Sequence, residues 1–159
     1  MQTIDALTRQ LAESLLGQGL MLATAESCTG GLIAKTCTDL AGSSEWFERG
    51  FVTYSNQAKV DMLGVALADL QTHGAVSEPV ARQMAAGALA RSRAQVAVGV
   101  TGIAGPGGGS IDKPVGTVWF GFASTREVTS ECLLFAGDRQ QVRQQSLEHA
   151  LRRLVAMLG

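Results

Sequence analysis

The first half of the chain alternates short apolar runs with segments of helical periodicity, and this alternation constrains the fold more than any other feature. Residues 20–25, LMLATA, have the length and apolarity of a buried strand, and residues 32–40 after them are helical in pattern. A leucine stripe at helical spacing precedes them over residues 4–16. Because a strand, a helix and a second strand in succession require a crossover, the first strands are expected to pair in parallel.

The second half contains strands that follow one another without an intervening helix, which calls for an antiparallel member of the sheet. The predicted strands cover residues 20–25, 50–55, 95–100, 115–123 and 130–136. The predicted helices cover residues 4–16, 32–40, 56–63, a turn near 66–70, 77–91 and the C-terminal segment from about residue 137. We therefore expect one α/β domain, residues 1–159, with a mixed, mostly parallel sheet of about five strands covered by helices on both faces.

A turn of small polar residues, ESCTGG, joins the first predicted strand to its helix and includes Ser27, Thr29 and Gly30. Unpaired N–H groups at the start of a helix, together with the helix dipole, favour an anion at such a place. The alternative is a plain tight turn in which Ser27 or Thr29 caps the helix. Spacing alone leaves both interpretations open.

The stretch from Ala41 to Lys59 combines a serine pair, Ser43 and Ser44, with Tyr54 and a lysine. Ser55 is a suitable N-cap for the helix that follows, which places Lys59 at the end of the first helical turn. The positive end of the dipole disfavours an ammonium there, and burial would disfavour it further. A neutral lysine can take a proton from a serine, so Ser44, Tyr54 and Lys59 form a candidate catalytic group.

A glycine-rich loop over residues 102–114 follows the predicted strand 95–100 and the residue Thr101. It matches neither the dinucleotide fingerprint nor the P-loop, since it leads into a strand and contains no Gly-Lys-Ser/Thr. Glycines such as Gly102 and Gly105 permit close approach of the backbone to a ligand. We interpret the segment as either a mobile loop or a ligand-contacting loop at the end of a strand.

Charge and composition argue against several other classes of function. The formal net charge of −1 gives no general attraction to nucleic acid, no apolar run is long enough to span a bilayer, and the N-terminus lacks a signal-peptide pattern, so we expect a cytoplasmic protein. The cysteines Cys28, Cys37 and Cys132 and the histidines His73 and His149 have no metal-ligand spacing, and we predict no metal and no cofactor. Cys28 could be a thiolate nucleophile at a helix start, but a small buried residue is the favoured interpretation.

Six long blocks resemble the CinA C-terminal domain family, in particular its stand-alone members, which are nicotinamide-nucleotide amidohydrolases. They cover nearly the whole chain in order: TAESCTGG at 24–31, GSSEWFERGFVTYSNQAK at 42–59, HGAVSE at 73–78, TGIAGPGGG at 101–109, KPVGTVW at 113–119 and GDRQQVR at 137–143. The resemblance implies a three-layer α/β/α fold, no metal, and a homo-oligomer. It also implies hydrolysis of the carboxamide of nicotinamide mononucleotide to nicotinate mononucleotide and ammonia, in pyridine nucleotide recycling.

The resemblance also assigns residues to the site. Ser44, Tyr54 and Lys59 match the family's active-site serine, tyrosine and lysine. The expected substrate-binding residues are Ser27, Thr29, Gly30, Thr101, Gly102, Gly105, Arg139 and Arg143, although either arginine alone could match the functional position of its block.

In the expected mechanism Lys59 activates Ser44, with Tyr54 assisting and Thr101 among the oxyanion donors. Two alternatives remain. In one, Lys59 activates water directly; in the other, the domain is regulatory, linked to competence or damage, and binds a nucleotide without catalysis.

Overall fold

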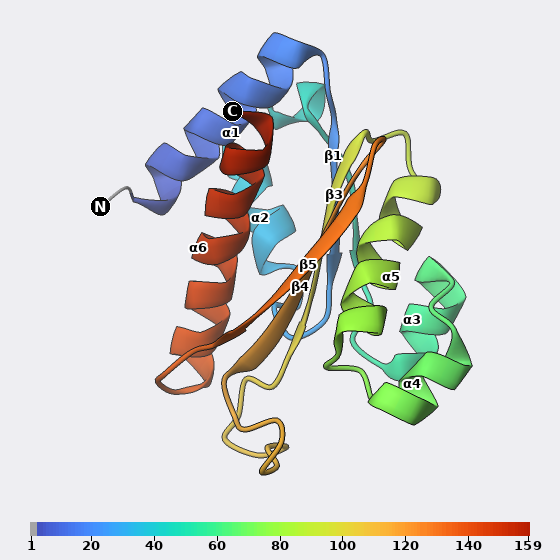
Figure 1. Ribbon diagram of the computed structural model, residues 1–159. Helices are drawn as coiled ribbons and strands as arrows, with labels where there is room; N and C mark the ends of the chain where they lie inside the picture. Colours follow the sequence, from blue (N-terminus) through green and yellow to red (C-terminus); the bar gives the residue numbers. More distant parts are fainter. Residues whose placement is uncertain (1–2) are drawn as a thin grey trace.

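The computed structural model describes residues 3–159 and has three layers, in which one sheet lies between two groups of helices (Figure 1). The elements are, in chain order, α1 (Ile4–Gln18), β1 (Leu22–Glu26), α2 (Leu32–Thr38), a short 3-10 helix η1 (Ser43–Glu45), β2 (Phe47–Val52), α3 (Asn56–Leu63), α4 (Leu67–His73), α5 (Glu78–Ala90), β3 (Val96–Gly102), β4 (Thr117–Ser124), β5 (Val128–Leu134) and α6 (Arg139–Leu158). The expected α/β fold class is confirmed.

The sheet has five strands in the order β2-β1-β3-β4-β5. β1 is the parallel partner of both β2 and β3, whereas β4 is antiparallel to both β3 and β5. Four strands therefore point in the same direction and only β4 runs against them. The carboxyl ends of β1, β2 and β3 meet at one edge, where ligands of open α/β sheets gather.

Each face of the sheet has its own apolar core. The helices α1, α2 and α6 cover one face, over a cluster that includes Leu11, Ile33 and Phe120. The helices α3, α4 and α5 cover the other face, over a cluster that includes Met84 and Ala97 (Figure 1). The burial of both faces explains why the central strands read as continuous apolar runs in the sequence.

The second strand lies three residues earlier than predicted, at Phe47–Val52 in place of 50–55. Its pairing with β1 begins opposite Leu22 and ends with Val52 opposite Glu26, the last residue of β1. Beyond that point β2 has no partner strand, so the chain leaves the sheet and turns into α3. The alternation of side chains in the sequence continues beyond Val52, but β1 ends there, so the residues after Val52 do not extend the strand.

Two helices have a serine at the N-cap position, and the two hydroxyls make different hydrogen bonds. The Ser55 hydroxyl accepts a hydrogen bond from the N–H of Ala58, at 3.0 Å, and caps α3 as predicted. Ser77 occupies the N-cap position of α5, but its hydroxyl donates to the carbonyl of Gly74, at 2.8 Å, so its side chain does not cap the helix.

Helix α5 lies unusually close to the sheet because two strand residues beneath it are glycines. A Cβ at Gly121 would come within 2.2 Å of the Ala81 carbonyl oxygen, and one at Gly99 within 2.9 Å of the Ala85 nitrogen. The small residues Ala81 and Ala85 of α5 therefore lie against glycines of β3 and β4.

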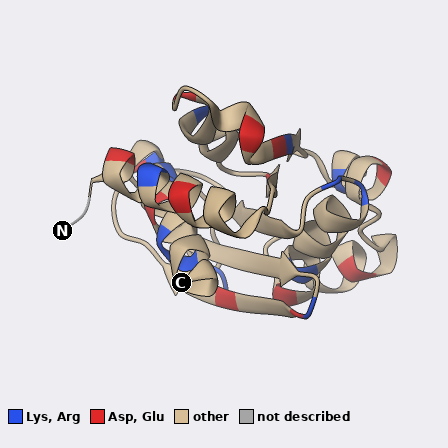
Figure 2. Cartoon of the chain, turned by 90° about the horizontal axis from the view of Figure 1, so that it is seen from above, with Lys and Arg blue, Asp and Glu red and all other residues tan. Residues whose placement is uncertain are grey.

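Basic and acidic residues are interspersed along the chain in Figure 2. Within residues 3–159, no helix is both long and apolar enough to cross a membrane.

Candidate active site

A cavity of about 290 Å³ opens where β1, β2 and β3 end. It is lined by Ser27, Cys28, Tyr54, Asn56, Lys59, Ala75, Val76, residues 101–105, Gly107, Gly108 and Arg139. A larger space of about 690 Å³ lies near the start of β3 and the turn after β4, but none of its lining residues is a buried ionisable group. The smaller cavity contains a buried lysine, and perturbed ionisable groups in clefts mark candidate active sites.

Lys59 is almost completely buried, with 1 % of its surface exposed, and it forms no ion pair with an acidic residue of the described chain. Burial disfavours the ammonium form and lowers the pKa of Lys59 below its ordinary value, an effect that the nearby Cys28 opposes only in part. The lysine was predicted at the end of the first turn of its helix, and it lies there.

Three oxygens surround the Lys59 amine. Its Nζ donates to the carbonyl oxygens of Thr53, at 3.0 Å, and Tyr54, at 3.1 Å, and to the hydroxyl oxygen of Ser27, at 3.0 Å. The Ser27 hydroxyl in turn lies 3.5 Å from the Tyr54 carbonyl. Three acceptors match the three hydrogens of an ammonium, and after loss of one proton the lone pair of the neutral amine can face the Ser27 hydroxyl.

Ser27 lies at the carboxyl end of β1, in the ESCTGG turn, with 8 % of its surface exposed. Its N–H donates to the carbonyl of Val100 in β3, which attaches the first residue of the turn to the sheet. A serine at this place, beside an amine that can accept its proton, is a candidate nucleophile.

The start of α2, which the sequence suggested as an anion site, is already engaged by a side chain. The carboxylate of Glu26, which is 1 % exposed, accepts hydrogen bonds from the N–H groups of Ile33, at 2.9 Å, and Ala34, at 3.0 Å. Neither Ser27 nor Thr29 caps this helix, whose N-cap is Gly31. An internal carboxylate therefore engages two of the N–H groups that an anion at this helix start would use, and an anion site in this turn stays a prediction.

Tyr54 contributes to the site mainly through its backbone. Its carbonyl receives the Lys59 hydrogen bond, whereas its side chain is 62 % exposed and its hydroxyl lies 3.1 Å from a guanidinium nitrogen of Arg139. Arg139 also donates to the carbonyl of Gly105, at 2.9 Å. Tyr54 and Arg139 thus bridge the cavity rim from the segment after β2 to the glycine loop and α6.

The two candidate arginines have different surroundings. Arg139 lines the cavity, whereas Arg143 does not line it and donates to the carbonyls of Cys28 and Thr29, each at 3.1 Å. Gly30 lies beneath the same guanidinium, since a Cβ there would come within 3.3 Å of an Arg143 nitrogen. Arg139 is therefore the arginine available to a ligand, and Arg143 braces the ESCTGG turn.

Thr101, Gly102 and Gly105 all line the cavity, but the Thr101 hydroxyl is engaged elsewhere. It donates to the carbonyl of Ala75, at 3.0 Å, and so ties β3 to the segment before α5. The expected role of this hydroxyl as an oxyanion donor does not fit that bond. Thr29 is fully buried and does not line the cavity, and neither does Gly30.

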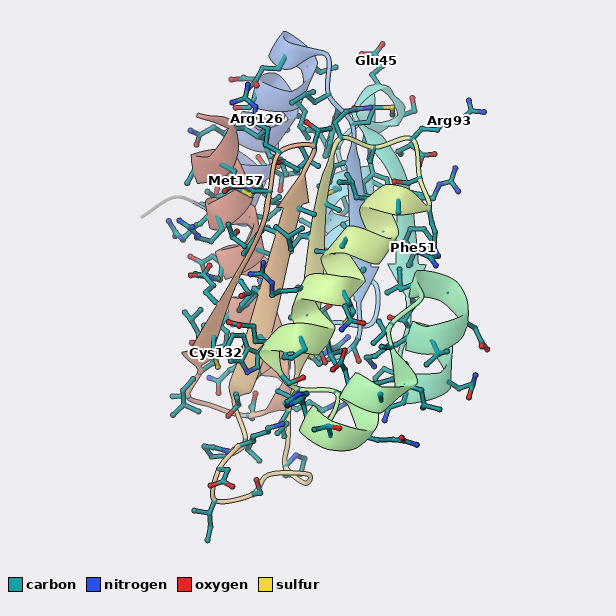
Figure 3. All side chains as sticks on the ribbon, turned by 45° about the vertical axis from the view of Figure 1, so that its right-hand side comes forward. Glu45, Phe51, Arg93, Arg126, Cys132 and Met157 are labelled. Carbon is teal, nitrogen blue, oxygen red and sulfur yellow. The ribbon has the colours of Figure 1, made fainter. Side chains whose placement is uncertain are left out.

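Ser44 is the predicted catalytic residue that the structure does not bring to the cavity. It lies exposed in η1, before the first residue of β2, whereas Lys59 follows the last. A strand of this length spans on the order of 20 Å. Glu45, the residue after Ser44, lies at the upper end of the molecule in Figure 3, and the glycine loop lies at the lower end. Within one chain, Ser27 takes the place beside Lys59 that Ser44 was expected to take.

Cys28 lines the cavity beside Ser27, but burial raises the pKa of its thiol to about 11. The thiol therefore stays protonated at neutral pH, in line with the interpretation of a small buried residue. Within residues 3–159, no group of three or more His, Cys, Asp or Glu side chains could hold a metal ion.

Sequence reasoning missed Asn56, Ala75 and Val76, which line the cavity, and it missed the role of Glu26. Four further lining residues lie within the loop that was predicted to contact a ligand, namely Ile103, Ala104, Gly107 and Gly108. Asn56 directly follows the capping Ser55, so its place near Lys59 could have been inferred. No periodicity or spacing signals Ala75 and Val76, which the Thr101 hydrogen bond brings to the cavity.

Comparison with known proteins gives the same family as the sequence resemblance, over nearly the whole chain. The family model described as the CinA C-terminal domain matches residues 4–158. The nicotinamide-nucleotide amidohydrolase PncC of Escherichia coli K12 is 56 % identical over 151 residues, which cover 93 % of this chain and 90 % of that protein. The PncC of Enterobacter agglomerans is 54 % identical over 158 residues, covering 96 % of each. The crystal structure of the competence/damage inducible protein CihA of Agrobacterium tumefaciens superposes over 100 % of both chains with a TM-score of 0.96 and 48 % identity.

Proposed function

The chain belongs to the CinA C-terminal domain family, and on this premise we propose that it is a nicotinamide-nucleotide amidohydrolase. The proposed reaction hydrolyses the carboxamide of nicotinamide mononucleotide to nicotinate mononucleotide and ammonia. The observation that carries the catalytic part of the proposal is the 3.0 Å contact between the Lys59 amine and the Ser27 hydroxyl, in a cavity at the ends of three parallel strands.

The first half of the reaction forms an acyl-enzyme. Lys59 takes the proton of Ser27 while the serine oxygen attacks the amide carbon. The nitrogen of the tetrahedral intermediate then takes a proton from Lys59 and leaves as ammonia. In the second half, Lys59 takes a proton from water, the hydroxide attacks the ester carbon, and Ser27 recovers its proton.

The developing oxyanion needs a fixed hydrogen-bond donor. The N–H of Cys28 directly follows the proposed nucleophile, and among residues 3–159 it donates to no other residue. In hydrolases with a serine on a sharp strand-to-helix turn, the residue after the nucleophile supplies such a donor. We assign this role to Cys28 N–H in place of the Thr101 hydroxyl, whose hydrogen is engaged by Ala75.

Arg139 is the proposed partner of the substrate phosphate. Its guanidinium uses two contacts at the rim, to Gly105 and Tyr54, which leaves further donors of its five for an anion. Two N–H groups at the start of α2 are not available for the phosphate, because the Glu26 carboxylate engages them.

Ammonia release from nicotinamide, its riboside and its mononucleotide tests the substrate. The mononucleotide should be hydrolysed with the highest kcat/KM, and Arg139→Ala should remove most of that preference by raising KM for the mononucleotide alone. Equal rates on all three amides would contradict the assignment of the phosphate to Arg139.

Mass spectrometry of the intact protein under single-turnover conditions tests the mechanism. A nicotinoyl-nucleotide adduct on Ser27 is the expected result. Full turnover without any adduct, together with activity retained in Ser27→Ala, would favour direct activation of water by Lys59. A Lys59→Ala protein with undiminished activity would contradict the whole catalytic proposal.

A further inference from the structure

Glu26 is a buried carboxylate one residue before the proposed nucleophile, and the mechanism above gives it no chemical step. It is 1 % exposed, lies outside the cavity lining, and is the last residue of β1, the strand that leads to the site. An ionised carboxylate inside a protein needs compensating donors, since an unpaired buried charge is strongly destabilising. The hydrogen-bond partners of Glu26 therefore indicate what it does.

Both partners belong to the first turn of α2, the helix that follows the turn with Ser27. The two carboxylate oxygens accept from the N–H groups of Ile33 and Ala34, seven and eight residues further along the chain. The Glu26 side chain therefore links the start of the ESCTGG turn to the helix that follows it. Such bonds, between a charged acceptor and N–H groups at a helix start, are among the stronger ones available to a protein.

The same turn is held from the other side by α6. Arg143 donates to the carbonyls of Cys28 and Thr29, so its guanidinium and the Glu26 carboxylate hold the turn at different backbone groups. We call this pair of contacts the turn clamp. Inside it, the turn's own hydrogen bonds run from Gly30 N–H to the Ser27 carbonyl and from Leu32 N–H to the Thr29 carbonyl.

We propose that Glu26 is a positioning residue for the hydrolysis: as the inner half of the turn clamp, it fixes Ser27 and the Cys28 N–H in register with the Lys59 amine. This inference rests on the proposed function. The carboxylate acts through the backbone of the turn and does not touch the substrate. Misplacement of a reacting group by about 1 Å costs on the order of 100-fold in rate, so a loosened turn should be visible in kcat.

The direct test is Glu26→Gln, which keeps the shape of the side chain but presents an NH2 group to one of the two N–H donors. We expect kcat for the mononucleotide to fall by about 10- to 100-fold with KM within about twofold of wild type. The pH at which kcat/KM rises should not move, because the carboxylate is engaged by α2 and forms no ion pair with Lys59. A folded Gln variant with wild-type kcat would overturn the proposal, and so would a displaced pH profile, which would mean that Glu26 acts through the charge of Lys59.

Thr3→Ala is the control for Glu26→Gln, because it also removes a side-chain hydrogen bond at the start of a helix, but away from the cavity. Thr3 caps α1 by accepting from the N–H of Ala6, on a helix that contributes no residue to the cavity. Its loss should lower Tm and leave kcat unchanged. If Glu26→Gln does not fold, Glu26→Asp decides: it keeps the charge and both oxygens at a shorter reach, and a kcat loss at constant KM supports positioning, whereas wild-type kcat overturns it.

Two measurements need no substrate and so separate this inference from the proposed function. Hydrogen exchange of the Ile33 and Ala34 amides should accelerate in Glu26→Gln, and labelling of Ser27 by a fluorophosphonate, followed by intact mass, should slow. If wild type releases no ammonia from nicotinamide mononucleotide, the proposed function fails on that result alone. Exchange and labelling that are unchanged in the variant would overturn the positioning role whatever the substrate is.

Discussion

Ser27 and Ser44 show what distance along a chain can and cannot indicate. Ser44 is the nearer of the two to Lys59 in sequence, and the family resemblance also assigned it to the site. In a parallel sheet, however, residues that follow neighbouring strands come together, and Ser27 follows β1 as the segment leading to Lys59 follows β2. Ser44 precedes β2 and therefore lies at the other edge.

Replacing each of the two serines by alanine should have opposite effects on kcat. Ser27→Ala should lower kcat at least about 1,000-fold, because the mechanism loses its nucleophile, and the protein should still fold since the side chain lies at an open cavity. Ser44→Ala should keep kcat within a few fold of wild type. Steady-state ammonia release with circular dichroism as a folding check measures both, and the reverse pattern would restore Ser44 as the nucleophile.

The buried Lys59 should make the free energy of unfolding depend on pH. Burial lowers its pKa in the folded protein, whereas an unfolded lysine keeps a pKa of about 10.4. Between these values the unfolded state binds more protons, so the free energy of unfolding rises with pH by up to about 1.4 kcal/mol per unit. Below the folded-state pKa both states are protonated, the full penalty of burying the ammonium remains, and the slope vanishes.

Lys59→Met isolates this contribution because it keeps an unbranched side chain without the titrating group. Urea unfolding at several pH values should show wild type gaining stability relative to the variant as pH rises toward about 10. A difference between the two proteins that stays constant with pH would mean that the buried lysine is charged throughout. The same depressed pKa should place the rise of kcat/KM with pH below the range of an exposed lysine.

At the scale of elements, the close contact of α5 with the sheet depends on strand glycines. Gly121→Ala should destabilise the protein by about 1–3 kcal/mol, because the new Cβ would come within 2.2 Å of the Ala81 carbonyl oxygen and the helix has to move. Gly17→Ala is the control: Gly17 lies in α1, and a Cβ added there would have no neighbour within 4 Å, so the exchange should stabilise by up to about 1 kcal/mol. The midpoints of urea unfolding measure both changes in stability. A Gly121→Ala protein as stable as wild type would show that α5 packs more loosely against the sheet than the structure indicates.

Local patterns predicted the existence of the elements well and their ends less well. The cap at Ser55 and the end of α1 near Gly19 follow from side-chain and backbone chemistry within a few residues. The end of β2 depends on where β1 stops, which is information from another part of the chain. The turn clamp was invisible for the same reason, since Arg143 reaches Cys28 across 115 positions in sequence.

At the scale of the whole molecule, the sheet has two edge strands, β2 and β5, each paired on one side only. Unpaired strand edges are places where a second chain can add. The resemblance to the family predicts a homo-oligomer, which stays a prediction for this protein. Light scattering after size-exclusion chromatography should give a mass that is a multiple of the single chain; a mass equal to one chain at assay concentration would contradict it.

Arg139 at the cavity rim and Arg143 against the ESCTGG turn both belong to α6, and their place in the chain bears on the order in which the proposed site is assembled. Ser27, Lys59 and the glycine loop are all translated before Arg139 and Arg143. A nascent chain can therefore bring the serine and the lysine together while the rim contact to Tyr54 and the outer brace on Cys28 are still missing. On the proposed mechanism, a translation product that ends before α6 would have a serine and a lysine on a turn without the brace of Arg143, and it should be less active than the full chain.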